Sequence, residues 1–139
     1  MTEFEIIRRY FSDRGVRRAD VVVGIGDDGA VLQLPSDCDL VTVVDTLVSD
    51  VHFPAEARAE DIGYKALAVN LSDVAAMGGV PAWATLALSM PRPDEPWLRS
   101  FAAGFFALAE QFDVQLVGGD TIRGPLTITV QVQGTIKKG

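Results

Sequence analysis

Two adjacent carboxylates occur in the stretch GIGDDGAVL, residues 24–32, in a turn between two apolar runs. Three glycines surround Asp27 and Asp28, and they allow the backbone to reach positive φ and to approach a ligand closely. Neighbouring carboxylates repel each other unless a cation neutralises them, and Mg²⁺ typically takes one or two carboxylates together with phosphate oxygens and water. The stretch therefore indicates either a magnesium site or an ordinary polar hairpin turn, and alone it does not decide between them.

Three further aspartates lie, like Asp27 and Asp28, among glycine, small and apolar residues, where water is expected to be scarce. Asp45 interrupts the apolar strand VTVVDTLV, where an unpaired charge is costly unless the strand turns it outward at a sheet edge. Asp73 shares a helix face with Asn70, although such a patch is usually the wet side of a helix. Asp120 follows two glycines in VQLVGGDT, which predicts either a turn whose amides hold phosphate oxygens or an ordinary turn. Together with the paired aspartates, these residues predict one pocket for cations and polyphosphate.

The chain has one histidine and one cysteine. His52 follows Asp45 in the segment SDVHF, and a single histidine is more often incidental than functional. Cys38 excludes an intramolecular disulfide, and its polar setting PSDCD predicts an exposed loop thiol that carries no chemistry.

Helical and strand patterns alternate along the 139 residues. A capping box at Thr2 and Glu5 predicts an opening helix, with an apolar stripe that includes Phe4, Ile7, Tyr10 and Phe11. The later patterns predict short strands around the glycine turn (19–35), a strand (39–53), a helix (60–77), a buried strand (83–90), a helix (97–112), a short strand ending in a glycine turn (114–121) and a half-exposed strand (126–136).

This order predicts one α/β domain, a mixed β-sheet packed by helices. The usual nucleotide motifs are absent, since no strand is followed by GxGxxG and a helix, and no GxxxxGK[ST] occurs. No apolar run approaches the length of a membrane span and the N-terminus does not read as a signal peptide, so we expect a cytoplasmic protein. The net charge of −7 argues against nucleic acid or an anionic membrane as the main partner.

Four stretches resemble, in order and spacing, the N-terminal half of the thiamine-monophosphate kinase family: GIGDDGAVL, VDTLVSDVHF, KALAVNLSDVAAMGGVPAW and VGGDTIRGPL. The similarity covers nearly the whole chain, and the combination is highly specific although each motif alone is not. That family is related to aminoimidazole ribonucleotide synthetase and selenide, water dikinase, whose N-terminal domains pair through their sheets into a dimeric barrel. The resemblance implies ATP-dependent phosphorylation of thiamine monophosphate to thiamine diphosphate by a homodimer, with nucleotide sites near the subunit boundary.

The resemblance also implies roles for individual residues, with Mg²⁺ as the cofactor and ATP as the co-substrate. Relatives often carry Ser-Thr-Asp where this chain has Val43, Val44 and Asp45, so any metal contact there would use backbone carbonyls. The acceptor phosphate is already ionised, so no catalytic base is expected. The implied metal ligands are Asp28, Asp45, Asp73, Asp120, Val43 and Val44; Gly119 and Asp120 match the ATP contact, His52 matches the substrate contact, and Asp27 has a weaker role.

The family continues into a C-terminal domain, so the resemblance implies that residues 1–139 are the isolated ATP- and Mg-binding and dimerisation domain, poorly active alone. A competing hypothesis is another kinase or synthetase of the same superfamily. A selenide dikinase is expected to carry a reactive Cys in an N-terminal glycine-rich segment, whereas Cys38 follows the aspartate turn. The sequence is also compatible with a noncatalytic Mg-nucleotide-binding dimerisation module and with a purely structural domain.

Overall fold

The chain opens with a short helix in the computed structural model, which describes residues 1–139. Helix α1 (Glu3–Ile6) starts at the predicted capping box, in which the Glu5 amide donates to the Thr2 hydroxyl at 3.2 Å. The Thr2 amide donates to the Glu5 carboxylate at 2.7 Å in return. These two bonds satisfy amide groups that a helix start otherwise leaves free, so the sequence motif does fix the first helical residue.

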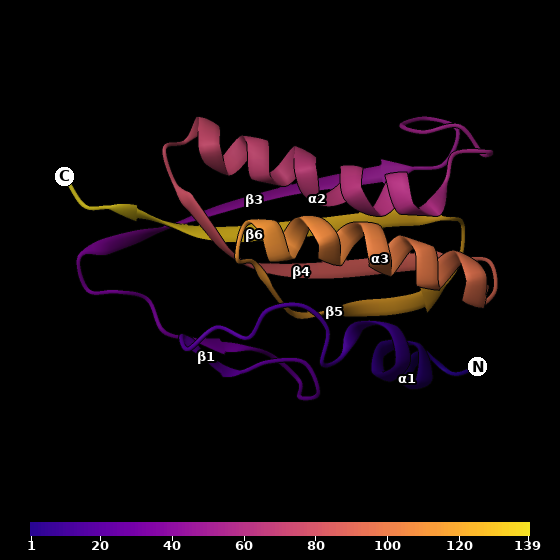
Figure 1. Cartoon of the computed structure of the whole chain (residues 1–139), viewed down its shortest axis with the longest axis horizontal. Coiled ribbons are helices and arrows are strands. Elements are labelled where there is room, and N and C mark those ends of the chain that lie inside the picture. Colours follow the sequence, from indigo (N-terminus) through magenta and orange to yellow (C-terminus); the bar gives the residue numbers. More distant parts are fainter.

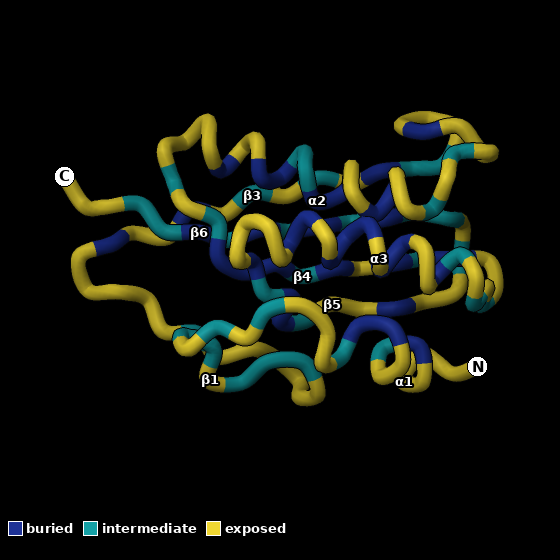
Figure 2. Tube along the Cα trace, in the orientation of Figure 1, coloured by how far each residue is buried: buried dark blue, intermediate teal, exposed yellow.

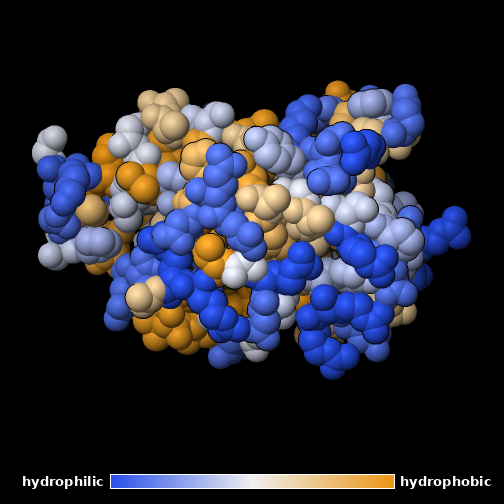
Figure 3. Space-filling model, viewed as in Figure 1, coloured by the Kyte–Doolittle hydropathy of each residue, from blue (hydrophilic) through white to orange (hydrophobic).

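A π-helical turn (Ile7–Phe11) follows α1 and alters the predicted apolar stripe. The turn is closed by a bond from the Ser12 amide to the Ile7 carbonyl at 2.8 Å, five residues apart, so the buried face shifts relative to an α-helix. Tyr10 and Phe11 are buried as predicted, but Phe4 is 82% exposed and Ile6 takes its place in the core. The stripe prediction is therefore wrong at Phe4. Figure 3 shows hydrophilic side chains gathered over this N-terminal segment, at the lower right of the view.

A four-stranded mixed sheet forms the body of the molecule (Figure 1). Its strands lie in the order β3 (Cys38–Val48), β6 (Thr127–Lys137), β4 (Val80–Met90) and β5 (Gln115–Arg123). β6 is antiparallel to both of its neighbours, whereas β4 and β5 are parallel. β3 and β5 are therefore the two edge strands, and the predicted mixed sheet is confirmed.

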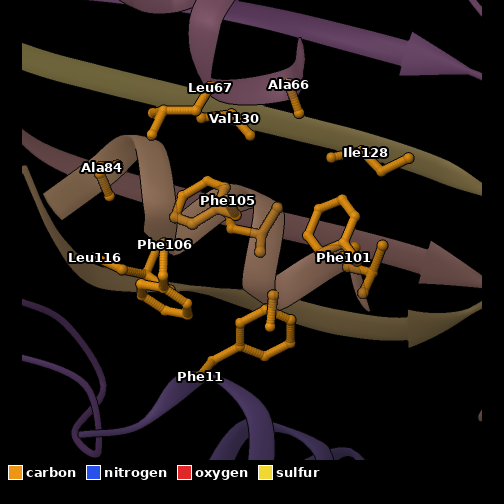
Figure 4. Close-up of a cluster of buried hydrophobic side chains, with 14 of the residues drawn as sticks. Phe11, Ala66, Leu67, Ala84, Phe101, Phe105, Phe106, Leu116, Ile128 and Val130 are labelled. Carbon is orange, nitrogen blue, oxygen red and sulfur yellow. The ribbon is translucent and has the colours of Figure 1, made fainter. Parts of the chain in front are cut away.

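Two long helices, α2 (Ala59–Ala76) and α3 (Glu95–Gln111), cover one face of the sheet. α3 begins at Asp94, whose carboxylate accepts from the Trp97 amide at 3.1 Å. The buried residues lie between these helices and the sheet, where three phenylalanines of α3 meet Leu116, Ile128 and Val130 of the strands (Figures 2 and 4). Neither α2 nor α3 has the length and hydropathy that a membrane span requires.

A small hairpin, β1 (Val21–Val23) paired with β2 (Val31–Leu32), stands outside the main sheet. The prediction of a single sheet is wrong for β1 and β2, which pair only with each other. The hairpin packs through Val21 and Leu32 onto a separate cluster of Ala82, Trp83 and Val117. The loop that joins β1 and β2 carries the paired aspartates. Its position therefore depends on how the hairpin is fixed to β4 and β5.

The face of the sheet that the helices leave uncovered is polar along its central rows. The Thr85 hydroxyl donates to the Gln131 side chain at 3.3 Å, and Gln131 donates in turn to Thr42 at 3.3 Å. Thr46 and Thr129 are joined by a hydrogen bond of 2.9 Å across β3 and β6. The alternation predicted for residues 126–136 is confirmed, since buried and half-buried residues alternate along β6.

Cys38 contradicts the prediction of an exposed loop thiol. It is the first residue of β3 and is only 8% exposed. Burial, followed by the nearby Asp37 carboxylate, raises the pKa of the thiol. Polar neighbours in sequence did not predict exposure, because Cys38 faces the interior as the first residue of β3 while its thiol still donates to the Asp37 carboxylate at 3.6 Å.

Helices α2 and α3 touch at two glycines. A Cβ on Gly63 would overlap the Phe101 carbonyl oxygen, and a Cβ on Gly104 would overlap that of Glu60. We predict that Gly104→Ala lowers the free energy of unfolding by about 2–4 kcal/mol, because backbone cannot rotate away from the added methyl. Urea unfolding of the variant and the original protein measures the difference in unfolding free energy. Gly29→Ala is the matched control, since nothing lies within 4 Å of its Cβ position. Equal unfolding free energies for the two variants would contradict the close helix contact.

Candidate functional site

A pocket of about 320 Å³ lies between the hairpin loop and β5. Gly26, Asp27 and Asp28 line one wall, and Gly119 and Asp120 line another. Its remaining lining is largely apolar and comes from the N-terminal helical segment, Ile25, and the strands β4 and β5. Two of the predicted motifs, about ninety residues apart in sequence, therefore meet at one pocket.

The hairpin loop has the backbone geometry that the glycines suggested. Gly26 has a φ of +118°, which only glycine adopts readily. The Asp28 amide donates to the Asp27 carboxylate at 2.8 Å, so one carboxylate oxygen of the pair is engaged locally. Both aspartates are exposed, and the expectation that they lie where water is scarce is wrong for them. The free carboxylate oxygens remain available to a ligand.

The GGDT segment is part of a strand and not the turn that was predicted. β5 continues through Asp120 to Arg123, with a bulge opposite Ala84 and Thr85. Gly119 has a φ of +149°, and a Cβ there would overlap the Leu86 carbonyl oxygen of β4. Glycine is therefore required at 119 by the neighbouring strand. Asp120 is exposed, and its carboxylate accepts from the Thr121 amide at 2.9 Å.

Asp45 and Asp73 form a second group, between β3 and α2. Asp45 is half-buried in β3, and its carboxyl group lies close enough to that of Asp73 for the two to interact. Burial raises the pKa of Asp45, the Asp73 carboxyl group raises it further, and His52 acts in the opposite direction. Two neighbouring carboxyl groups that are not both ionised can share a proton, and a bound cation can take the place of that proton. Asp73 itself is exposed, so this group opens to solvent.

Asn70 lies three residues before Asp73, and its side chain is completely buried. Its amide nitrogen donates to the Ala66 carbonyl at 3.0 Å, whereas its Oδ1 has no hydrogen-bond partner. The predicted polar helix face is therefore split: Asp73 is on the wet side and Asn70 is in the interior. A buried amide oxygen without a donor is a cost to the fold.

His52 lies in the loop after β3 and is exposed. Its Nδ1 accepts from the Val48 amide at 2.9 Å, so the neutral ring carries its proton on Nε2. The Lys65 ammonium donates to the His52 carbonyl at 2.7 Å and ties the loop to α2. The ring is therefore held by its own strand end and offers one outward donor.

Val43 and Val44 lie in the middle of β3, which pairs only with β6. Successive carbonyls of a strand point to opposite sides, so one of these two residues directs its carbonyl to the free edge. The carbonyl of Val43 or Val44 that faces the free edge lies within two residues of Asp45. This position is compatible with its predicted role as a backbone ligand of a metal ion.

The two groups of aspartates are separated within the chain. Asp45 is opposite Val130 of β6, Val130 is opposite Leu86 of β4, and Leu86 is opposite Gly119. Three strand spacings place Asp45 and the Gly119–Asp120 pair roughly 14 Å apart. Nowhere do three His, Cys, Asp or Glu side chains gather closely enough to hold a metal ion. The fold therefore does not gather all the aspartates of one chain into a single pocket, contrary to the prediction from the sequence.

Each group still fits a hard cation by the chemistry of its donors. Mg²⁺ is rarely held by an all-protein cage, and it usually takes one or two carboxylates and completes its shell with phosphate oxygens and water. Asp45 and Asp73 present two neighbouring carboxyl groups. The loop aspartates and Asp120 line the same pocket. Both groups have room on the solvent side for a phosphorylated ligand.

The model of the family described as AIR synthase related protein, N-terminal domain, matches residues 26–136. This range holds all of the predicted site residues, from Asp27 to Asp120. The chain belongs to this family. The mixed sheet with helices on one face is the fold of its solved relatives, and the predicted fold class is confirmed.

Thiamine-monophosphate kinases are among the relatives of this chain. The kinase of Salmonella typhimurium is 52% identical over 137 residues, which are 99% of this chain and 42% of that protein. The kinase of Bacillus subtilis is 41% identical over 143 residues, which span all of this chain and 44% of the relative. The chain thus spans less than half of the length of these curated relatives.

Solved structures agree with these relatives. The crystal structure of thiamine-monophosphate kinase from Stenotrophomonas maltophilia K279a gives a TM-score of 0.84 at 57% identity, over 88% of this chain and 39% of that one. The structure of AaThiL complexed with AMPPCP and TMP gives a TM-score of 0.71 at 32% identity, over 82% of this chain and 37% of that one.

The residues that fix the hairpin to the sheet were missed by sequence reasoning. The Asp20 carboxylate accepts from the Trp83 indole at 3.0 Å and from two nitrogens of Arg18 at 3.0 and 2.8 Å. These contacts join the start of β1 to β4 across sixty-three residues. The only sequence signal is a charged pair directly before an apolar strand, which is common on protein surfaces.

The Asp20 contacts predict a pH dependence of stability. The Arg18 guanidinium, followed by the Trp83 indole, holds the pKa of Asp20 below its ordinary value of 3.8, while burial opposes them. A lowered folded-state pKa stabilises the protein above 3.8, and this stability is lost as the pH falls through the lowered value. We expect Asp20→Asn to lower the unfolding free energy by about 1 kcal/mol at neutral pH and by progressively less toward pH 2. Urea unfolding from pH 7 to pH 2 measures the gap, and a gap independent of pH would contradict the ionised pair.

Proposed function

We propose that this family member takes part in the ATP-dependent phosphorylation of thiamine monophosphate to thiamine diphosphate. The observation that carries the proposal is the meeting of the Asp27–Asp28 loop with Gly119 and Asp120 at one pocket. Relatives at 41–52% identity are thiamine-monophosphate kinases, and one solved relative is complexed with AMPPCP, an ATP analogue, and TMP. No residue is assigned as a base, since the acceptor phosphate is already ionised.

We further propose the residues that hold each component. Mg²⁺ would supply charge neutralisation at the transferring phosphoryl group. This chain's own residues would bind and orient the two substrates, with Gly119 and Asp120 against ATP, His52 Nε2–H donating to the thiamine substrate, and Asp27 in an accessory role. The proposed metal ligands are Asp28, Asp45, Asp73 and Asp120 side chains, with a backbone carbonyl of Val43 or Val44.

We propose that the protein acts as a homodimer. Within one chain Asp45 and Asp120, one from each aspartate group, lie on opposite edge strands, so neither group alone surrounds a nucleotide and an acceptor. The uncovered face of the sheet is the surface on which a second copy would close into a barrel. This arrangement would bring the Asp45–Asp73 group of one copy beside the Asp28–Asp120 group of its partner, and complete each site from two chains.

A product assay tests the proposed reaction. We propose that the full-length form continues into the C-terminal domain of the family, because this chain spans less than half of the length of its curated relatives. The purified protein, as this chain alone and in that full-length form, is incubated with Mg²⁺, ATP and either thiamine monophosphate or aminoimidazole precursors, and thiamine diphosphate is quantified. We expect product from thiamine monophosphate only, with the 139-residue chain much the slower. Activity on the aminoimidazole substrate alone would assign another reaction of the superfamily. Binding of Mg²⁺-ATP without any product in full-length form would leave the noncatalytic module as the function.

A further inference from the structure

Arg18, Asp20 and Trp83 form a compact set of contacts, here called the clamp, on the side of the sheet away from the helices. Trp83 is 1% exposed, and its indole donates to Asp20 at 3.0 Å. Arg18 approaches both oxygens of Asp20, through Nε at 3.0 Å and through a terminal nitrogen at 2.8 Å. The guanidinium carbon also lies 5.7 Å from the centre of the Trp83 ring, within reach of a cation–π contact.

The clamp reaches three separate parts of the chain. The second terminal nitrogen of Arg18 donates to the Asp113 carbonyl at 2.7 Å, in the turn before β5. The Arg18 amide donates to the Gln115 side chain at 2.6 Å, at the first residue of β5. The Asp20 carbonyl accepts from the Gln33 amide at 2.8 Å, which closes the base of the hairpin. One arginine and one aspartate thus tie the hairpin base to both β4 and β5.

These two strands are the ones that carry the opposite wall of the pocket. β5 carries Gly119 and Asp120, and β4 supplies Leu86 beneath them. The hairpin loop with Asp27 and Asp28 has no hydrogen bond to β5. Residues 26–30 of the loop are exposed, and only Ile25 packs against the main core. The hairpin base and Ile25 therefore set the distance between the paired aspartates and Asp120.

We propose that the clamp positions the Asp27–Asp28 loop against Asp120, and so sets the affinity of the pocket for Mg²⁺-nucleotide. This inference rests on the proposed function, because it takes the pocket as the nucleotide site. Arg18, Asp20 and Trp83 touch no lining aspartate, and their role is that of positioning residues. Lysine cannot replace Arg18 here, because a single ammonium cannot form the paired bonds to Asp20 and reach Asp113 as well.

Three substitutions weaken the clamp at separate atoms. Trp83→Phe keeps an aromatic ring and removes the indole N–H donor. Asp20→Asn removes the negative charge that pairs with Arg18. Arg18→Lys removes the planar guanidinium that donates to both oxygens of Asp20. Trp97→Phe is the matched control, since Trp97 stacks on Phe101 at 5.0 Å in α3 and makes no contact with the hairpin.

Two readouts separate positioning from general destabilisation. Hydrogen exchange is followed in residues 20–33 and in α2 and α3, and calorimetry gives the affinity for Mg²⁺-AMPPCP. We expect exchange in residues 20–33 to accelerate by more than the roughly fivefold that a 1 kcal/mol loss of global stability gives in α2 and α3. We expect an affinity about 10-fold lower in each clamp variant, with exchange and affinity both unchanged for Trp97→Phe. In full-length form, KM for ATP rises by the same factor while kcat stays within about threefold.

The outcomes that overturn the inference are distinct. Faster exchange in residues 20–33 with unchanged affinity would make the clamp a structural contact only. Lower affinity with exchange in α2 and α3 accelerated as much as in residues 20–33 would assign the loss to global destabilisation. Asp28→Asn is measured in parallel: if it leaves the affinity unchanged, the proposed site is wrong and the inference falls with it, whereas if it lowers the affinity and the clamp variants do not, only the inference fails.

Discussion

Asp73→Asn is expected to make the metal-free protein more stable and the proposed kinase reaction at least about 100-fold slower. Asp45 lies beside Asp73, and burial together with the Asp73 carboxyl group raises the pKa of Asp45. An amide at 73 removes the repulsion between them and can donate to Asp45, so the melting temperature in EDTA should rise by roughly 2–4 °C. The same change removes a charged ligand from the proposed magnesium site, so Mg²⁺-ATP affinity and turnover should both fall.

The opposite signs of these two effects make the experiment informative. Thermal unfolding with EDTA and with Mg²⁺-ATP is measured alongside full-length kinetics. Asp61→Asn is the control, because it makes the same chemical change in the first turn of α2, away from both aspartate groups. We expect its melting temperature and kinetics to stay close to those of the original protein. A loss of stability in Asp73→Asn, or unchanged affinity for Mg²⁺-ATP, would show that the carboxylate is structural.

The elements of this fold were largely predictable because their signals are local. The capping box at Thr2 and Glu5, the breakers after residue 77 and the apolar spacing in 97–112 each act within a few residues, and α1, α2 and α3 lie where they predict. The errors have equally local causes. The π-helical turn moved Phe4 to the surface, and two glycines in GGDT suggested a turn where β5 continues.

The arrangement of the aspartates was not predictable in the same way, because it depends on strand order. Asp45 and Asp73 meet because α2 packs over β3 and β6, and no residue pattern near either aspartate encodes that choice. Asp28 and Asp120 line the same pocket because the hairpin packs on Trp83. No sequence motif around Trp83 indicates this contact. The resemblance named these aspartates as one set, whereas their separation into two groups became visible only in the sheet topology.

That separation leads to the second large effect. If each site takes Asp45 and Asp73 from one chain and Asp120 from its partner, a mixture of inactive Asp45→Asn and inactive Asp120→Asn proteins should regain activity. A mixed dimer then holds one site with both substitutions and one site with neither. After random exchange of subunits, we expect roughly a quarter of the original turnover, because half of the dimers are mixed and each has one intact site. The measurement is thiamine diphosphate formation after co-refolding of the two full-length variants.

A mixture of Asp45→Asn with Asp73→Asn is the matched control, because these residues belong to the same group within one chain. Every site in that mixture carries one substitution, so it should stay inactive whichever way the subunits pair. Light scattering first establishes that each variant is a dimer, so that an inactive mixture cannot be attributed to dissociation. Dimers that mix freely and regain nothing would place all four aspartates in one site of one chain. The roughly 14 Å between the two edge strands would then have to be bridged by the ligand or by a rearrangement of the sheet edge.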